Sequence, residues 1–288
     1  GLAQVRIMAE KAIDQEGSGW EDDLANAIVH AVDQGADIIS MSWGGRTWVA
    51  SVLVQEALKY AYDHDVLLVA SAGNDNSNLK TYPAAYNEVI AVAATDECDD
   101  PASFTNFGEW IELAAPGVNI YSTVWDDTYA YMSGTSMACP HIAGVAALIW
   151  SQFPNMTRDQ VRAQLRYTSD DLGDPGFDIY YGYGRVNARK AVELPPLDHD
   201  LLTLTLETPS CLKPNSSAVI NSTVLNFGTS DESSIVVQLL INGSLEDSTI
   251  IGFLASGASK TISFLWSPEI EGVYNLTFKG MQALLTVL

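Results

Sequence analysis

Residues 133–149 combine a turn of glycine and hydroxyl residues with a long apolar run that is typical of a buried helix. Ser136 lies at the predicted start of that helix, where backbone N–H groups have no partner inside the helix. These N–H groups and the helix dipole would stabilise an alkoxide or an adjoining oxyanion, provided that a base lies nearby. Ser136 is therefore a candidate nucleophile, and an ordinary helix N-cap is the alternative explanation for a serine at this place.

Asn74 is a second candidate, because a side-chain amide fixed beside a nucleophile can donate a hydrogen bond to the developing oxyanion. It stands in the sequence Gly-Asn-Asp-Asn at 73–76, which forms turns in any protein. Taken alone, Asn74 is therefore better explained as a turn residue.

A serine nucleophile also needs a base, and the chain has four histidines. His141 follows Ser136 by five residues, but this spacing on a helix turns the ring away from the hydroxyl. His30, His64 and His199 fall on a predicted helix face, in an Asp-His-Asp turn and in a proline-rich segment. We expect none of the four to act as the base.

The order of the elements predicts how these residues are positioned. Up to residue 192, apolar β-rich runs at 37–42, 66–70 and 89–94 alternate with helical patterns at 22–34 and 51–63, which favours an α/β fold with a parallel sheet. Two prolines mark a linker at 193–197. Residues 198–288 hold short alternating segments between turn residues, as in a small β-sandwich; these segments are 201–206, 218–225, 235–241, 260–265 and 273–278.

Composition excludes several classes of protein. With 47% hydrophobic and 17% charged residues among 288, the chain is not intrinsically disordered. The net charge of −22 opposes binding to nucleic acid and to anionic membranes, and no apolar run is long enough to span a bilayer. Cys98, Cys139 and Cys211 lie far apart, so the sequence indicates neither a zinc site nor a disulfide-rich scaffold.

The segment 134–144, Gly-Thr-Ser-Met-Ala-Cys-Pro-His-Ile-Ala-Gly, resembles the nucleophile motif GTSMAxPHVAG of the subtilisin-like serine proteases (peptidase S8 family), with Ile142 in place of valine. Collinear resemblance covers about the first 192 residues. It includes the segments 1–3, 7–9, 17–19, 37–45, 70–74, 82–85, 89–94, 103–108, 115–117 and 182–188. The resemblance implies a subtilisin-like parallel sheet with helices on both faces, followed by an all-β sandwich.

The resemblance also implies roles for individual residues. Ser136 would be the acyl-forming nucleophile, and Asn74 the side-chain oxyanion donor. A peptide substrate would lie extended between two backbone segments, with Thr81 near the base of its S1 pocket and Tyr82–Pro83 as a cis peptide beside it. The substrate-binding residues are Gly17, Ser18, Gly19, Ser42, Trp43, Gly44, Ser71, Ala72, Gly73 and Thr81. Trp43 replaces a smaller apolar residue, and it either narrows the pocket or packs in the core.

In this family the catalytic aspartate and histidine precede the position of Gly1. We therefore expect both upstream, and we expect residues 1–288 alone to be nearly inactive. The alternative is a noncatalytic peptide-binding or surface-adhesion protein that keeps the cleft. The chemistry would need no cofactor. A structural calcium ion is compatible with the resemblance, and the acidic run at 96–100 is either a cation site or a solvated loop, so no ligand is assigned.

The second domain resembles the CARDB type of adhesion-related β-sandwich, in segments 199–201, 224–228, 254–257 and 264–268. It would tether the protease to a cell surface or polymer, or act as a spacer. The resemblance implies an extracellular or cell-surface protein that acts on protein or peptide. Five glycosylation sequons agree with export, at Asn155, Asn215, Asn221, Asn242 and Asn275.

Overall fold

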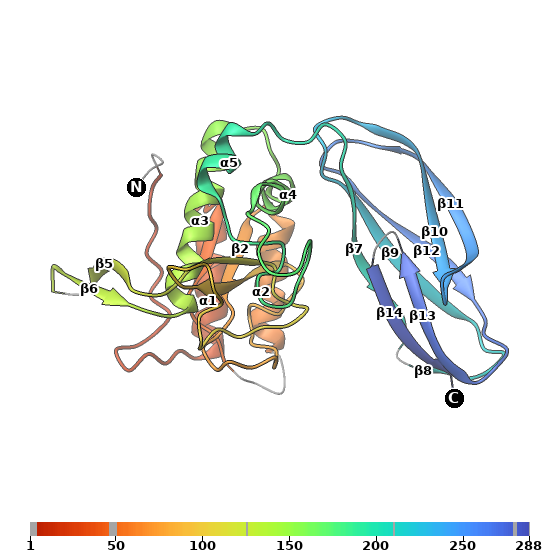
Figure 1. Cartoon of the computed structure of the whole chain (residues 1–288), viewed down its shortest axis with the longest axis horizontal. Helices are drawn as coiled ribbons and strands as arrows, with labels where there is room; N and C mark the ends of the chain where they lie inside the picture. The colour runs from red at the N-terminus through yellow and green to blue at the C-terminus, as the bar shows by residue number, and fades with distance from the viewer. Residues whose placement is uncertain (1–4, 46–50, 125, 210, 279–280, 288) are drawn as a thin grey trace. The chain divides into compact units, whose positions relative to one another are not determined.

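The computed structural model (Figure 1) describes residues 5–45, 51–124, 126–209, 211–278 and 281–287. The chain divides into two compact units, Gly1–Pro195 and Pro196–Leu288. The division falls between two prolines, which lack the N–H that a continuing helix or central strand would need. No helix among the described residues is long and apolar enough to cross a membrane.

The first unit is built on a four-stranded parallel sheet in the order β1-β2-β3-β4. Its strands are β1 (Ile38–Met41), β2 (Leu67–Ser71), β3 (Val89–Thr95) and β4 (Leu113–Pro116). Every residue of β2 and β3 is buried, which explains why both strands are continuous apolar runs rather than alternating ones. A sheet buried on both faces must be covered on both.

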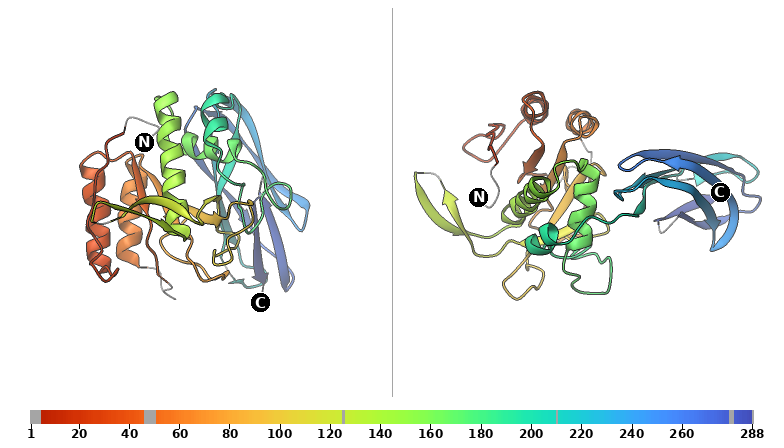
Figure 2. Two further views of the ribbon diagram at one scale, coloured as in Figure 1. Left: turned by 60° about the vertical axis from the view of Figure 1, so that its left-hand side comes forward. Right: turned by 90° about the horizontal axis from the view of Figure 1, so that it is seen from above.

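Helices provide that cover, and alternate residues of each strand face different helices. Leu68 and Ala70 of β2 pack with α1 (Glu21–Asp33) and α2 (Val52–Asp63). Leu67 and Val69 pack with α3 (Thr135–Gln152), α4 (Arg158–Thr168) and α5 (Ala188–Glu193). Figure 2 shows α1 and α2 on one side of the strands, and α3 and α4 on the other. The expected parallel sheet with helices on both faces is confirmed.

Side chains mark where most of these helices begin. Ser51 caps α2 by accepting the Val54 N–H at 3.3 Å, and Asn187 caps α5 by accepting the Lys190 N–H at 3.0 Å. At α4, Thr157 and Gln160 form a capping box, in which each side chain accepts the backbone N–H of the other. The residue that caps α3, Gly134, has no side chain to offer, so the start of α3 depends on another part of the chain.

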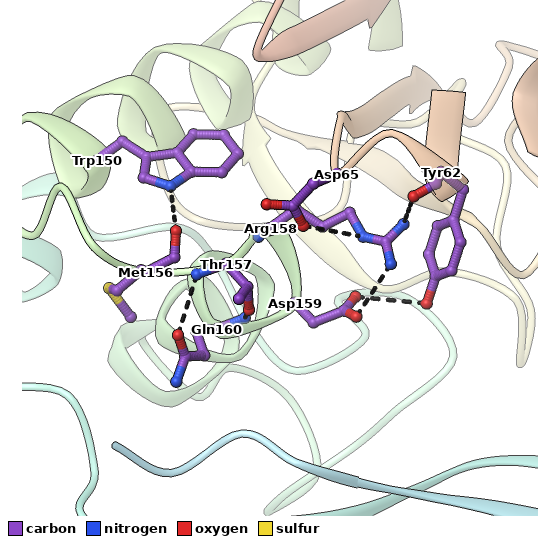
Figure 3. Close-up of polar contacts among 8 residues, drawn as sticks. All are labelled: Tyr62, Asp65, Trp150, Met156, Thr157, Arg158, Asp159 and Gln160. Atoms are coloured by element: carbon purple, nitrogen blue, oxygen red, sulfur yellow. Dashed lines mark hydrogen bonds and ion pairs between the residues drawn. The ribbon is translucent and has the colours of Figure 1, made fainter. Parts of the chain in front are cut away.

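The connection between α3 and α4 is anchored on both sides (Figure 3). The Trp150 indole N–H donates to the Met156 carbonyl at 2.7 Å, which folds the connection back onto α3. The Arg158 guanidinium donates to the Tyr62 carbonyl at the end of α2 and lies 3.2 Å from Asp159. These bonds hold α3 and α4 as one layer.

A two-stranded hairpin leads into α3. It consists of β5 (Ile120–Val124) and β6 (Thr128–Met132), which pair antiparallel. Tyr121, Tyr129 and Tyr131 share one face and are each more than half exposed, with the Tyr121 and Tyr131 rings 4.8 Å apart. The sequence analysis had not predicted this hairpin.

The second unit is an antiparallel β-sandwich, as expected. One sheet has the strand order β11-β10-β13-β14-β8 and the other β12-β9-β7. Among the described strands of this unit, β14 and β8 form the one parallel pair. Their bounds are β7 Leu201–Glu207, β8 Cys211–Leu212, β9 Ala218–Asn226, β10 Glu232–Ile241, β11 Ser244–Leu254, β12 Ser259–Trp266, β13 Gly272–Phe278 and β14 Met281–Val287. Phe264 and Phe278 meet edge to face across the core at 5.2 Å.

Candidate active site

The carboxyl ends of β1 and β2 bring the candidate residues together. Ser42 directly follows β1, Asn74 lies three residues after β2, and Ser136 is the second residue of α3. Open parallel sheets bind ligands beyond the carboxyl ends of their strands, because loops from neighbouring strands meet there. Residues more than 90 positions apart in sequence thus share one site.

Asn74 supplies the cap that α3 lacks. Its Oδ1 accepts the Thr135 backbone N–H and the Thr135 hydroxyl, both at 2.9 Å. The Thr135 hydroxyl oxygen in turn accepts the Gly73 N–H at 3.0 Å. Because an N–H can donate only to the oxygen of the amide, these bonds fix which way the Asn74 side chain is turned. Its Nδ2 donors therefore point away from Thr135 and stay available.

The absence of a side chain at Gly134 keeps the space beside these donors open. A Cβ placed on Gly134 would lie 3.4 Å from Asn74 Nδ2 and 3.7 Å from the Ser136 backbone nitrogen. Both nitrogens thus border the same point. Both nitrogens carry N–H groups, the kind of donor that an oxyanion site beside a serine hydroxyl needs.

Ser136 is held by a reciprocal pair of bonds with Ser42. The Ser42 hydroxyl donates to the Ser136 carbonyl at 2.9 Å, and the Ser136 hydroxyl donates to the Ser42 carbonyl at 3.2 Å. Ser136 is half-buried, so its hydroxyl stays within reach of solvent. In this arrangement the hydroxyl proton is directed to a carbonyl oxygen, which is too weak a base to activate a nucleophile.

Asn106 is a site residue that the sequence analysis missed. It is 1% exposed, and its side-chain amide donates to the Ala72 carbonyl at 2.9 Å and to Thr81 Oγ1 at 3.1 Å. Its Oδ1 accepts the backbone N–H groups of Asp75 and Ser77. Asn106 thereby fastens the loop that carries Asn74. Its place in the family-like segment 103–108 was the available signal.

Three of the residues predicted at the S1 pocket, Gly44, Gly73 and Thr81, lie close together. A Cβ on Gly73 would lie 2.5 Å from Asn106 Nδ2 and 3.2 Å from Thr81 Oγ1, and φ at Gly73 is +102°. A Cβ on Gly44 would lie 3.0 Å from the Thr81 methyl. Ser71 and Ala72 are buried at the end of β2. The Tyr82–Pro83 bond is cis, as expected.

Comparison with known proteins identifies the first unit. Residues 1–184 match the subtilase family (Peptidase_S8), and residues 198–280 match the CARDB family. This chain belongs to the subtilase family. Within this match, residues 1–4, 46–50 and 125 lie outside the described residues.

Three relatives show how far the similarity extends. Thermitase of Thermoactinomyces vulgaris is 44% identical over 187 residues, which are 65% of each chain. The thermophilic serine proteinase of Bacillus sp. (strain AK1) is 44% identical over 193 residues, 67% of this chain and 47% of that protein. The halolysin-like extracellular serine protease Nep of Natrialba magadii is 46% identical over 201 residues, 69% of this chain and 36% of that protein. This subtilase chain thus spans about half to two thirds of thermitase and the Bacillus proteinase.

A solved structure agrees with the fold. The crystal structure of a lanthipeptide protease superposes with a TM-score of 0.59 at 30% identity, covering 64% of this chain and 69% of that one.

The other predicted substrate-binding residues are less directly connected to Ser136 and Asn74. Gly17, Ser18 and Gly19 form an exposed turn before α1. In it, the Ser18 N–H donates to the Asp14 carboxylate at 2.8 Å, and the Ser18 carbonyl accepts the Asp14 backbone N–H at 2.8 Å. No hydrogen bond joins these three residues to Ser136 or Asn74 within the described chain. Trp43 is half-buried and packs against the core that α1 and α2 share with the sheet.

Each of the four histidines has a partner within its own unit. His141 Nδ1 lies 2.9 Å from the Met137 carbonyl, and His64 Nδ1 lies 2.7 Å from the Tyr60 carbonyl. His30 and His199 pair with Glu10 and Glu232 at 2.9 and 2.8 Å. Among the described residues of the subtilase unit, no histidine is hydrogen-bonded to Ser136.

Neither the Cys139 thiol nor the acidic loop at 96–100 adds a reactive group to this site. Cys139 lies one turn after Ser136, and burial raises the pKa of its thiol, so it stays protonated. In the acidic loop, Asp96 Oδ1 accepts the N–H groups of Cys98 and Asp100, while Asp99 pairs with Arg185. The described residues contain no group of three acidic, histidine or cysteine side chains arranged to hold a metal ion.

Proposed function

We propose that the complete protein is a secreted or surface-attached serine endopeptidase that cleaves peptide bonds through an acyl-enzyme on Ser136. The convergence of Asn74 Nδ2 and the Ser136 N–H on the space beside Gly134 carries this proposal. A catalytic histidine and aspartate would come from upstream of Gly1, where the subtilase pattern has them.

The chemistry follows from these positions. Ser136 Oγ would attack the peptide carbonyl carbon while an imidazole accepts the hydroxyl proton. The carbonyl oxygen would then carry the negative charge between Asn74 Nδ2 and the Ser136 N–H. Collapse of the intermediate would break the C–N bond, with the amine taking the proton from the imidazolium, and water would hydrolyse the resulting ester. All of these groups are protein groups, so the proposed reaction needs no cofactor.

Two observations support a further segment of chain beside the subtilase unit. Among the described strands, β1 is paired along one edge only, by β2. In the segment before α1, Val5, Ile7 and Met8 are 53%, 91% and 42% exposed. An open sheet edge and exposed apolar side chains are features that proteins normally cover.

The decisive experiment compares residues 1–288 with a chain extended upstream by its own gene sequence, each beside Ser136→Ala. We expect the extended chain to hydrolyse peptides and to react with a fluorophosphonate at Ser136, and the short chain to do neither at a comparable rate. Robust Ser136-dependent turnover by the short chain would refute the missing base. An inert extended chain would favour a noncatalytic peptide-binding protein instead.

Asn74→Ala in the extended chain tests the oxyanion donor. In subtilisin, loss of the oxyanion-hole asparagine costs about 10²–10³-fold in kcat, and we expect a loss of the same order here. Because this donor acts on the transition state, KM should change little. An unchanged kcat would remove Asn74 from the mechanism.

We further propose that the CARDB unit tethers the protease to a cell surface or polymer. We also propose that any structural calcium ion of the complete protein is bound by residues other than the catalytic and substrate-binding residues named above. The net charge of −22 makes an acidic polymer an unfavourable partner. Binding of the isolated unit, residues 198–288, to cell-wall fractions would test the tether, and equal binding by an unrelated β-sandwich would refute it.

A further inference from the structure

The interior of α3 contains a proline directly after the nucleophile turn. Pro140 lies four residues after Ser136, inside Thr135–Gln152. In a regular helix the N–H of residue 140 would donate to the carbonyl of residue 136. Proline has no N–H, and its ring crowds that same carbonyl. The helix therefore leaves the Ser136 carbonyl without its normal donor.

Ser42 fills this gap from the end of β1. Its hydroxyl donates to the Ser136 carbonyl at 2.9 Å, a distance typical of a well-formed hydrogen bond. The reverse bond from the Ser136 hydroxyl to the Ser42 carbonyl shows that the two residues face each other. The donor that Pro140 removes from the helix is thus replaced by a side chain from the sheet.

We propose that Ser42 is a positioning residue for catalysis, whose hydroxyl fixes the Ser136 backbone by serving the carbonyl that Pro140 leaves unbonded. This role rests on the proposed function of Ser136, and it differs from lining a substrate pocket. Asn74 holds Thr135 through its N–H, and Ser42 holds Ser136 through its carbonyl. The loops after β2 and β1 thereby fix two consecutive residues, and with them the Oγ and the N–H of Ser136.

The proposal predicts that Pro140→Ala restores the kcat that Ser42→Ala loses. In the extended chain, Ser42→Ala should lower kcat about tenfold with little change in KM, because it removes the bond to the Ser136 carbonyl and keeps the Ser42 backbone, the part expected to border a peptide substrate. Pro140→Ala should restore the helical N–H to the Ser136 carbonyl. The double variant should therefore return to within about threefold of wild-type kcat, and Ser42→Thr, which keeps the hydroxyl, should stay close to wild type.

Ser40→Ala is the matched control. Ser40 also lies on β1 beside α3, but its hydroxyl is 3.5 Å from Cys139 Sγ and is not bonded to Ser136. The effects of Ser40→Ala and Pro140→Ala on kcat should be independent, so that Pro140→Ala does not rescue any loss caused by Ser40→Ala. If Ser42→Ala raised KM with kcat unchanged, or if Pro140→Ala failed to rescue it, the positioning role would be wrong and Ser42 would only line the substrate site.

A second readout separates this inference from the function on which it rests. A double-mutant cycle for thermal unfolding can be measured on residues 1–288 and needs no activity. It compares wild type with Ser42→Ala, Pro140→Ala and the double variant. Pro140→Ala should recover most of the melting temperature that Ser42→Ala loses. If the wild-type extended chain proves inert, the proposed function fails, and the positioning role in catalysis fails with it. The unfolding cycle would still decide whether Ser42 serves the Ser136 carbonyl, and additive losses would show that it does not.

Discussion

Glu112 offers a test of what holds the subtilase unit together. It precedes β4, is 6% exposed, and its Oε1 accepts the Nε–H of Arg162 and of Arg166, both at 2.8 Å. Arg162 also donates to the carbonyls of Asn87 and Val89 at 3.0 and 3.3 Å. The Glu112 carboxylate thus joins α4 to the start of β4, and Arg162 joins α4 to the segment where β3 begins. We propose Glu112→Gln, which keeps the shape and removes the charge.

The size of the effect follows from the pKa of Glu112. Burial alone would raise this pKa, but the adjoining Arg162 and Arg166 outweigh it and lower the pKa from 4.5 to about 2. A difference of this size between folded and unfolded states is worth ~3 kcal/mol of unfolding free energy at neutral pH. Removing one partner of a buried ion pair costs about 3–5 kcal/mol, because the other charge stays buried without a counter-charge. We therefore expect Glu112→Gln to destabilise the unit by ~3 kcal/mol at pH 7.

The same pKa fixes the pH dependence. A carboxyl group whose pKa is lowered on folding stabilises the protein above its unfolded pKa, and this contribution disappears as the pH falls toward the folded pKa. The difference between wild type and Glu112→Gln should therefore be constant above about pH 5 and shrink between pH 4.5 and 2.

Hydrogen exchange in urea, read on peptides from β3 and β4, would measure this unit apart from the β-sandwich. Glu193→Gln is the control, because Glu193 pairs with Arg189 at 2.9 Å on the surface, where the two side chains are 57% and 82% exposed. It should cost less than about 0.5 kcal/mol. A loss below about 1 kcal/mol for Glu112→Gln, or a difference that does not shrink in acid, would refute the reasoning.

Three further predictions concern the two units and the charge of the chain. Raising NaCl from 0.1 to 1 M should raise the melting temperature by a few degrees, because salt screens the repulsion within a net charge of −22, and a fall would contradict this. Asn226→Ala should destabilise the β-sandwich alone by at least ~2 kcal/mol in calorimetry, since the fully buried Asn226 side chain bonds the backbone of Gly228, Ser230 and Leu254. Limited proteolysis should cut first at 193–197, and deletion of 198–288 should leave the subtilase unit folded; its collapse would show that the units depend on each other.

The sequence was most informative where one residue type determines the structure. Buried parallel strands need apolar residues on both faces, so the runs at 66–70 and 89–94 predicted β2 and β3 directly. The hairpin of β5 and β6 escaped prediction because its outward tyrosines resemble neither a buried strand nor a polar loop. In the second unit, β11 was missed because its first five residues are all exposed and hide the alternation.

Side-chain networks were harder to foresee than strands. Asn106 reads in sequence as one polar residue in a loop, and only the fold shows that it bonds four groups on the segment 72–81. The bond between Ser42 and Ser136 joins residues 94 positions apart. Local pattern cannot predict such contacts, because they depend on which strand ends the topology places side by side.

Under the proposed function, the candidate site has two parts with different origins. Asn74 is oriented by Thr135, and Ser136 is bonded to Ser42, so the proposed nucleophile and the two proposed oxyanion donors are fixed by contacts within the described part of the subtilase unit. None of these contacts involves a histidine. The base of the proposed mechanism would therefore have no need to rebuild α3 or the loop after β2. It has only to attract the Ser136 hydroxyl proton away from the Ser42 carbonyl, a rotation about one side-chain bond.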